Sequence, residues 1–187
     1  MTQLLAAYQA PQRQYHTLQH LSECLALLSR HAALAEQPAE VEMALWFHDA
    51  VYAATAGDNE ACSSAWVASS LGLAGAAPAR IERISRLVLA TRHTLLPQGR
   101  DAQLLVDIDL AILGAPPARF EQYEAQVRAE YGWVPGSLFR RGRRAILAHF
   151  LARDPLYHTP HLQAAFAAQA RKNLIHALQR LAAGPGC

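Results

Sequence analysis

The chain has 187 residues, of which 52% are hydrophobic and 17% are charged. This composition is typical of a globular protein with a substantial core, and it excludes a disordered chain. No apolar run approaches the roughly 20 residues that a membrane-spanning helix needs. The first residues also lack the charged-then-apolar order of a signal peptide. We therefore expect a cytoplasmic protein that does not engage a membrane.

The formal net charge of +2 is too small to indicate a general nucleic-acid-binding surface. Basic charge is locally dense only in the segment 140–144, which holds four arginines. The three cysteines are scattered and form no CxxC pair, so we expect neither a disulfide framework nor a thiolate zinc site. The nine histidines are the unusual part of the composition, since several lie beside apolar residues.

Helix-forming residues dominate the chain, and no segment alternates with the period of two that marks a strand. Prolines and glycines fall between the helical segments, and the connections are short. The predicted fold is an all-α, single-domain helical bundle of about seven to nine helices. In chain order, the predicted helices span about 3–10, 13–35, 38–52, 59–71, 78–96, 101–113, 117–131, 137–152 and 160–183.

The predicted helix that begins at Pro38 carries a histidine and an aspartate in an apolar setting. At 100° per residue, His48 lies at the centre of the apolar stripe, and Asp49 lies at its edge. A buried imidazole beside a carboxylate needs partners, and a divalent cation would satisfy both groups. The alternative is a core histidine bonded to backbone, next to a solvated aspartate.

Two further segments offer groups of the same chemistry. His16 and His20 are spaced i, i+4 and share a helix face beside the leucine stripe, although surface histidines would show the same spacing. Asp107 and Asp109 flank the apolar stripe of a later helix, where acidic residues are rarely buried without a partner. Helical geometry leaves open which aspartate points inward.

This order of groups resembles the HD-domain superfamily of metal-dependent phosphohydrolases. The resemblance covers nearly the whole chain and is specific only in the combination of its motifs. The chain is similar to an uncharacterised bacterial branch of predicted hydrolases of about this length. The segments that carry it are Tyr15-His16-Thr17-Leu18-Gln19-His20, Trp46-Phe47-His48-Asp49-Ala50-Val51-Tyr52, Asn59-Glu60, Asp107-Ile108-Asp109-Leu110-Ala111-Ile112-Leu113-Gly114 and Arg128-Ala129-Glu130-Tyr131.

The resemblance implies a metal site, with Asp107 as an alternative or supporting ligand. Such a site suits one divalent ion (Mn²⁺, Mg²⁺, Fe²⁺, Co²⁺ or Ni²⁺), and a second ion is left open. The implied ligands are His20, His48, Asp49 and Asp109.

Four other residues receive functional hypotheses, each with a structural alternative. His93 could bind a second metal or protonate a leaving group, or it could be a core histidine. Glu60 could orient or deprotonate the attacking water, or it could complement a helix dipole. Arg13 and Arg143 could bind substrate phosphate, or they could belong to solvated helix faces.

The implied reaction is phosphate-ester hydrolysis by a metal-bound water, with a small phosphorylated metabolite or nucleotide as substrate. The predicted organisation is one domain over 1–187, with a metal-site core at about 13–113 and the helices of 117–183 packed on it. A homodimer is left open. The alternative functions are a non-catalytic helical module that binds a metal or nucleotide, and a di-iron oxygenase of the HD type.

Overall fold

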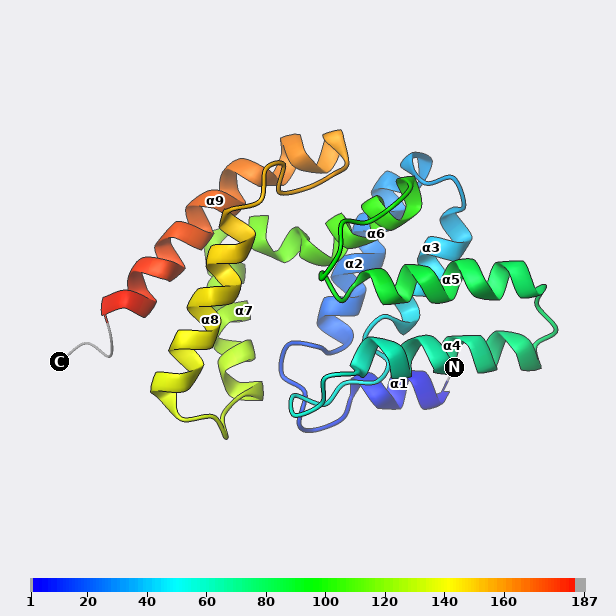
Figure 1. Cartoon of the computed structure of the whole chain (residues 1–187), viewed down its shortest axis with the longest axis horizontal. Helices are drawn as coiled ribbons and strands as arrows, with labels where there is room; N and C mark the ends of the chain where they lie inside the picture. Colours follow the sequence, from blue (N-terminus) through cyan, green and yellow to red (C-terminus); the bar gives the residue numbers. More distant parts are fainter. Residues whose placement is uncertain (1, 184–187) are drawn as a thin grey trace. The chain divides into compact units, whose positions relative to one another are not determined.

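The computed structural model describes residues 2–183, and over this range the protein is helical and contains no strand (Figure 1). The all-α prediction is confirmed. The described helices are α1 (Thr2–Tyr8), α2 (Leu18–His31), η1 (Ala32–Leu34), α3 (Pro38–Phe47), α4 (Asn59–Leu73), α5 (Pro78–Ala90), α6 (Arg100–Asp109), η2 (Leu110–Gly114), α7 (Pro117–Glu130), α8 (Gly136–Leu151) and α9 (Pro160–Ala183), where η marks a 3-10 helix.

The chain divides between Asp109 and Leu110 into two compact units. Unit 1 contains α1 to α6, and unit 2 contains η2 and α7 to α9. The predicted metal-site core ended at about residue 113, close to this boundary. The single-domain organisation stays a prediction. Within 2–183 no helix combines the length and hydropathy that would let it cross a membrane.

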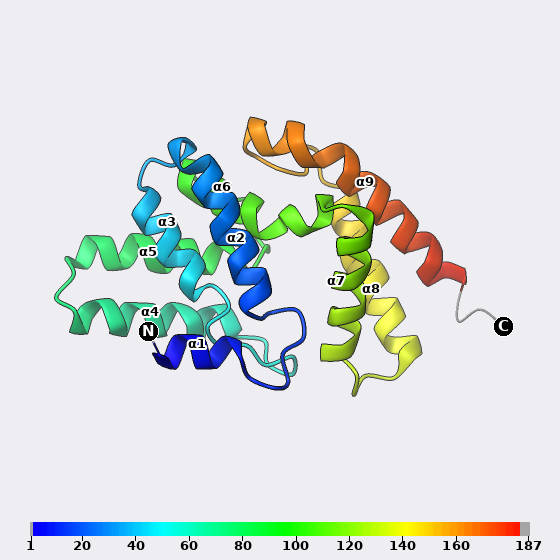
Figure 2. The same ribbon diagram turned by 180° about the vertical axis from the view of Figure 1, so that it is seen from behind.

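Helix α3 is the centre of unit 1, because α2, α4, α5 and α6 all pack against it (Figure 2). Val41, Ala44 and Leu45 on α3 have no exposed surface. A helix that is covered on several sides needs apolar residues around most of its circumference, which explains the nearly continuous apolar sequence before His48. Glu40 is a buried exception on α3, and Arg83 of α5 neutralises it with two hydrogen bonds, at 2.8 and 2.6 Å.

Several predicted helix boundaries near the candidate site were wrong. Helix α5 ends at Ala90 rather than near residue 96, so His93 lies beyond the helix that was predicted to carry it. Helix α2 begins at Leu18 rather than near Arg13, because Thr17 has extended backbone angles and its hydroxyl accepts a hydrogen bond from the Gln19 amide. Helix α3 ends at Phe47, so His48 and Asp49 lie in the turn after the helix. There the His48 ring binds the Leu45 carbonyl, which a continuing helix would use for the amide of residue 49.

Asp101 was predicted to cap its own helix, but α6 already begins at Arg100. The Asp101 carboxylate instead accepts hydrogen bonds from the amides of Glu36 and Gln37, at 2.6 and 3.0 Å. These amides lie at the start of α3. The acid therefore holds the beginning of the helix that leads to His48.

Unit 2 is built where η2 meets α9. A Cβ at Gly114 would lie 2.7 Å from Phe166, so only glycine permits this close approach. Asn173 of α9 donates to the carbonyls of Leu113 and Ala115, each at 2.9 Å. These bonds satisfy backbone acceptors that end η2, and they fix α9 against it.

Candidate metal centre

The candidate centre lies within unit 1 and gathers side chains from three places in the sequence. His20 is on the first turn of α2, and Asp109 is the last residue of α6. His48 and Asp49 come from the turn after α3. Both imidazoles are buried, whereas the two carboxylates retain 18% (Asp49) and 13% (Asp109) side-chain exposure.

Four side-chain atoms converge. His20 Nε2 lies 3.2 Å from His48 Nε2 and 3.1 Å from Asp109 Oδ1. Asp49 Oδ2 lies 2.9 Å from His48 Nε2 and 3.6 Å from His20 Nε2, and Asp109 Oδ1 is 3.6 Å from His48 Nε2. Two ligand atoms that each lie about 2.1 Å from one ion are roughly 3.0–3.4 Å apart. The spacing therefore matches that of ligands around a shared cation.

The far side of each imidazole determines which atom faces the cluster. His48 Nδ1 is 2.7 Å from the Leu45 carbonyl, and a carbonyl only accepts, so this nitrogen carries the proton. In the neutral ring Nε2 is then a bare acceptor that faces three other acceptors. His20 Nδ1 is 3.0 Å from the Tyr15 hydroxyl, and the same tautomer follows when Nδ1 donates to that oxygen.

The charges around the cluster explain its ionisation. Burial would lower the pKa of His48, but Asp49 and Asp109 outweigh it, and the pKa is well above its ordinary value. Burial would raise the pKa of both aspartates, yet the surrounding histidines lower each of them on balance. The two carboxylates therefore remain charged, and they attract either a proton or a metal ion to the buried nitrogens.

Sequence reasoning missed Cys24. Its thiol lies one helical turn after His20, 3.7 Å from His20 Nδ1 and 3.8 Å from Nε2. Burial, followed by the charges of Asp109 and Asp49, raises the pKa of Cys24 well above its ordinary value. The i, i+4 spacing of His20 and Cys24 was the available signal, because it places the two side chains on one helix face. Together His20, Cys24, His48 and Asp109 could hold a metal ion.

His93 also reaches the cluster, through Asp109 rather than through the histidines. Its Nε2 lies 3.0 Å from Asp109 Oδ2, the oxygen on the other side of the carboxylate. The backbone of His93 has φ of +55°, a conformation that is uncommon for residues other than glycine. Such a conformation persists where surrounding contacts impose it, and it places the imidazole on Asp109.

Arg13 has a different environment from the one expected of a phosphate ligand. Its guanidinium is buried and donates to the carbonyls of Asp49 and Ala50, at 2.6 and 2.8 Å, and to that of His16 at 3.2 Å. These bonds orient the backbone of the turn that carries His48 and Asp49. We therefore assign Arg13 to positioning that turn rather than to binding substrate phosphate.

The other predicted residues have different partners in the described contacts. Glu60 Oε2 lies 3.8 Å from Arg92, and the His16 ring stacks on Tyr52 with centroids 3.9 Å apart. Asp107 is fully buried, whereas its neighbour Asp109 meets the histidines. Arg143 belongs to unit 2, where Glu124 pairs with it and it is buried over the Tyr123 ring. Neutralisation by Glu124 leaves Arg143 unsuited to the predicted phosphate contact.

Comparison with known proteins adds no relative: no family model, curated protein or solved structure matches the chain. The resemblance to the HD-domain superfamily therefore stays a prediction that rests on the residues themselves.

Proposed function

We propose that the protein is a metal-dependent phosphohydrolase that acts on a small phosphorylated metabolite or nucleotide. The observation that carries the proposal is the convergence of His20 Nε2, His48 Nε2 and Asp109 Oδ1 at mutual distances of 3.1–3.6 Å, with Asp49 Oδ2 beside them. When bound there, a divalent cation supplies a Lewis acid that polarises a phosphoryl oxygen and lowers the pKa of water. The resemblance of the same residues to HD-domain phosphohydrolases favours a phosphate ester as the substrate class.

In this proposal the protein residues have separate tasks. His20, His48, Asp49 and Asp109 hold the ion, and the Leu45 carbonyl and Tyr15 hydroxyl keep the two imidazoles in their ligand tautomers. His93 orients Asp109 and can exchange a proton at Nε2 when the leaving oxygen of the substrate needs one.

In this proposal, Arg92 is the positively charged residue that binds the phosphate group of the substrate. It directly precedes His93, its side chain is 40% exposed, and its only described ionic partner is Glu60 at the long distance of 3.8 Å. A partly exposed guanidinium with only a long ion pair can reorient toward phosphate oxygens, since bidentate contacts to phosphate are stronger than a long surface ion pair. In this proposal Glu60 orients Arg92 before the substrate binds, a role that differs from the expected activation of water.

The test is a screen of phosphate esters with the purified protein loaded with Mn²⁺, Co²⁺ or Mg²⁺. We expect phosphate release that falls by at least about a hundredfold in His48→Ala and in Asp109→Ala, because each change removes a ligand. His176→Ala and Asp58→Asn are the controls, since both residues are exposed and lie outside the cluster. The absence of turnover by metal-loaded protein across the screen would contradict the hydrolase proposal.

Cys24 favours a second candidate, a closed and non-catalytic metal site. Two histidines, an aspartate and a thiolate would complete a tetrahedral shell without a position for substrate, as in structural zinc sites. Absorption of the Co²⁺-loaded protein separates the candidates, because a thiolate ligand adds an intense near-ultraviolet band that Cys24→Ser would remove. In the hydrolase, Cys24 stays protonated, so we expect no such band and nearly unchanged turnover in Cys24→Ser.

A further inference from the structure

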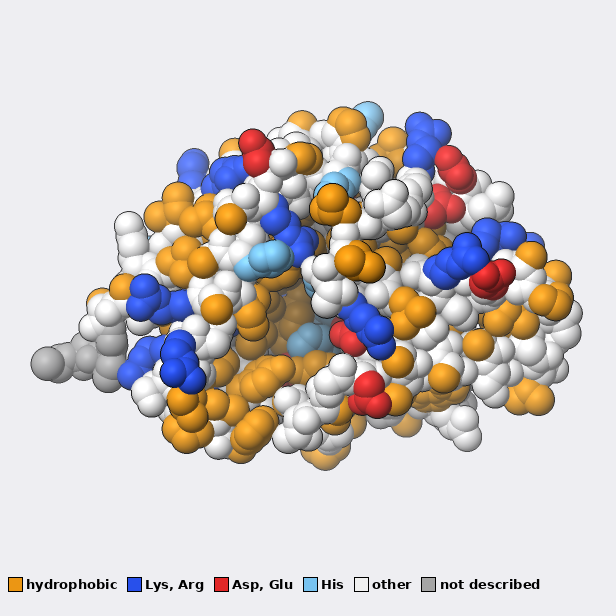
Figure 3. Space-filling view, in the orientation of Figure 1, with side chains coloured by type: hydrophobic (Ala, Val, Ile, Leu, Met, Phe, Trp, Pro, Cys, Tyr) orange, Lys and Arg blue, Asp and Glu red, His pale blue; other side chains and the backbone are white. Residues whose placement is uncertain are grey.

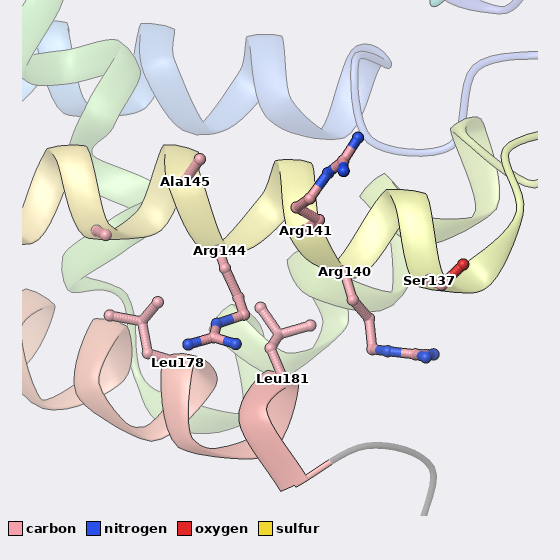
Figure 4. Close-up of a pocket in the computed structure, with 8 residues that line it drawn as sticks. Ser137, Arg140, Arg141, Arg144, Ala145, Leu178 and Leu181 are labelled. Atoms are coloured by element: carbon pink, nitrogen blue, oxygen red, sulfur yellow. The ribbon is translucent and has the colours of Figure 1, made fainter.

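Unit 2 contains a pocket between α8 and α9 that is built separately from the candidate metal centre. Its volume is about 640 Å³, which lies in the range of small-molecule sites. In Figure 4, the side chains of Arg140 and Arg144 extend from α8 toward the α9 side. The main lining residues are Ser137, Arg140, Arg141, Arg144, Leu178 and Leu181.

The charge around this pocket is of one sign. The sequence of unit 2 contains ten basic and four acidic side chains, and neither α8 nor α9 contains an aspartate or glutamate. Blue side chains accordingly gather over the adjoining ends of α8 and α9, beside orange ones (Figure 3). Unit 1 has the opposite balance, with seven basic and eleven acidic side chains.

The acids of unit 2 are engaged elsewhere. One of the four acidic side chains, Glu130, is buried. In the part of the chain that the structure describes, no ion pair joins a carboxylate to Arg140, Arg141 or Arg144. The other three acids form the pairs Glu121–Arg180, Glu124–Arg143 and Asp154–Arg171.

The spacing of the pocket arginines causes repulsion between their positive charges, and a bound anion would reduce this repulsion. Arg140 and Arg144 are i, i+4 neighbours and both extend toward α9, so two like charges lie near each other on the helix (Figure 4). Ser137 lies in the first turn of α8, where unpaired backbone amides and the helix dipole also favour negative charge. Each of these features stabilises the same kind of ligand group.

The opposite wall of the pocket is apolar. Leu178 and Leu181 of α9 are half-buried, and Ala145 and Ala148 line the α8 side. Side chains of this kind offer no polar contact, and they favour a ligand that buries carbon atoms beside its charged group. The arginines and the leucines together describe a ligand with two chemically different ends.

We propose that the pocket of unit 2 binds a small organic diphosphate or polyphosphate. Its phosphate groups contact Arg140 and Arg144, and its apolar portion packs on Leu178 and Leu181, whereas Arg141 extends to the other side of α8 (Figure 4). Each planar guanidinium group can bind a pair of phosphate oxygens, and two arginines one helical turn apart can each contact one phosphate, so adjacent phosphates fit this arrangement better than a single carboxylate does.

The test is calorimetric titration of metal-free, full-length protein with inorganic pyrophosphate at moderate salt. Metal-free protein separates this site from the metal centre, whose acidic cluster repels anions. We expect Arg140→Gln and Arg144→Gln each to weaken binding about five- to tenfold. Lys172→Gln is the matched control, because it removes one positive charge from α9 outside the pocket, and we expect a change of less than about twofold.

Two results would overturn the proposal: no binding of pyrophosphate, or an equal loss in Lys172→Gln and Arg144→Gln. Unfolding is not expected to interfere, since removal of one of two like charges at i, i+4 does not weaken the helix, and circular dichroism verifies this.

A separate experiment tests the apolar contact between the ligand and Leu178. We expect butyl diphosphate to bind severalfold more tightly than pyrophosphate, and Leu178→Asp to abolish that difference. Equal affinity for the two ligands would refute the apolar contact.

Discussion

Around the candidate metal centre, neighbouring groups orient the candidate histidine ligands through hydrogen bonds. Leu45 contributes only its carbonyl, yet that group determines which nitrogen of His48 faces the cluster. Tyr15 has the corresponding position at His20, with its hydroxyl 3.0 Å from Nδ1 and its ring buried. Such outer partners increase the basicity of a ligand and restrict its rotation, so their loss weakens metal binding without removing a ligand atom.

Tyr15→Phe tests this role. The change deletes one hydroxyl from a buried site, and we expect the affinity for Co²⁺ or Mn²⁺ to fall about tenfold or more while the helical content is unchanged. The measurement is metal titration followed by calorimetry. Tyr8→Phe is the control, since its hydroxyl binds the Trp46 carbonyl at 3.1 Å and no ligand side chain. An equal loss of metal affinity in both variants would contradict a specific role for Tyr15.

Among the helices, α3 is held at both ends by side chains that are distant in sequence. Asp101 accepts the amides of Glu36 and Gln37 at its start, and Arg13 binds the carbonyls of Asp49 and Ala50 beyond its end. The preceding Gln37 makes no side-chain cap of its own. The position of the His-Asp turn therefore depends on α6 and on the loop before α2.

Asp101→Ala is expected to lower the free energy of unfolding by about 1 kcal/mol, because two amides lose a charged acceptor at a helix start. Urea denaturation followed by circular dichroism measures this change. Glu42→Ala serves as the comparison, since Glu42 is an exposed acid on the same helix with no described partner. If the two variants have the same stability, Asp101 does not cap α3.

At the scale of the whole molecule, the boundary between the units falls where α6 passes directly into η2. No linker separates Asp109 from Leu110, and Leu110 to Gly114 are all buried. Asp109 is also the candidate ligand that unit 1 contributes from this end. Independent domains are usually joined by exposed and flexible linkers, whereas this boundary falls in a buried helical run.

We therefore expect a single unfolding transition in urea. Circular dichroism reports on both units, and in Trp133→Phe the remaining tryptophans, Trp46 and Trp66, report on unit 1 alone. The two signals should give the same midpoint in this variant. Separated midpoints would show that the units unfold independently, against the single-domain prediction.

Much of the helical framework was predictable, because apolar residues recur with the helical period and prolines mark where segments begin. Pro38, Pro78, Pro117 and Pro160 are each the first residue of the helix predicted to begin at or near them. The predicted helix starts at Arg13 and Asp101 were wrong, because these side chains bind residues far along the chain and a local cap at Thr17 begins α2. Cys24 shares a helix face with His20, but its proximity to His48 and Asp109 depends on how the helices pack.

The sequence by itself determined the helical class and identified the imidazole and carboxylate groups, because periodicity and residue chemistry are local properties. Only the tertiary structure decided that His48 and Asp49 occupy a turn, that Asp109 rather than Asp107 meets the histidines, and that Arg13 binds backbone. Each of these depends on contacts between residues 28 to 89 positions apart in the sequence. Local spacing cannot specify such contacts, because they follow from how the helices pack.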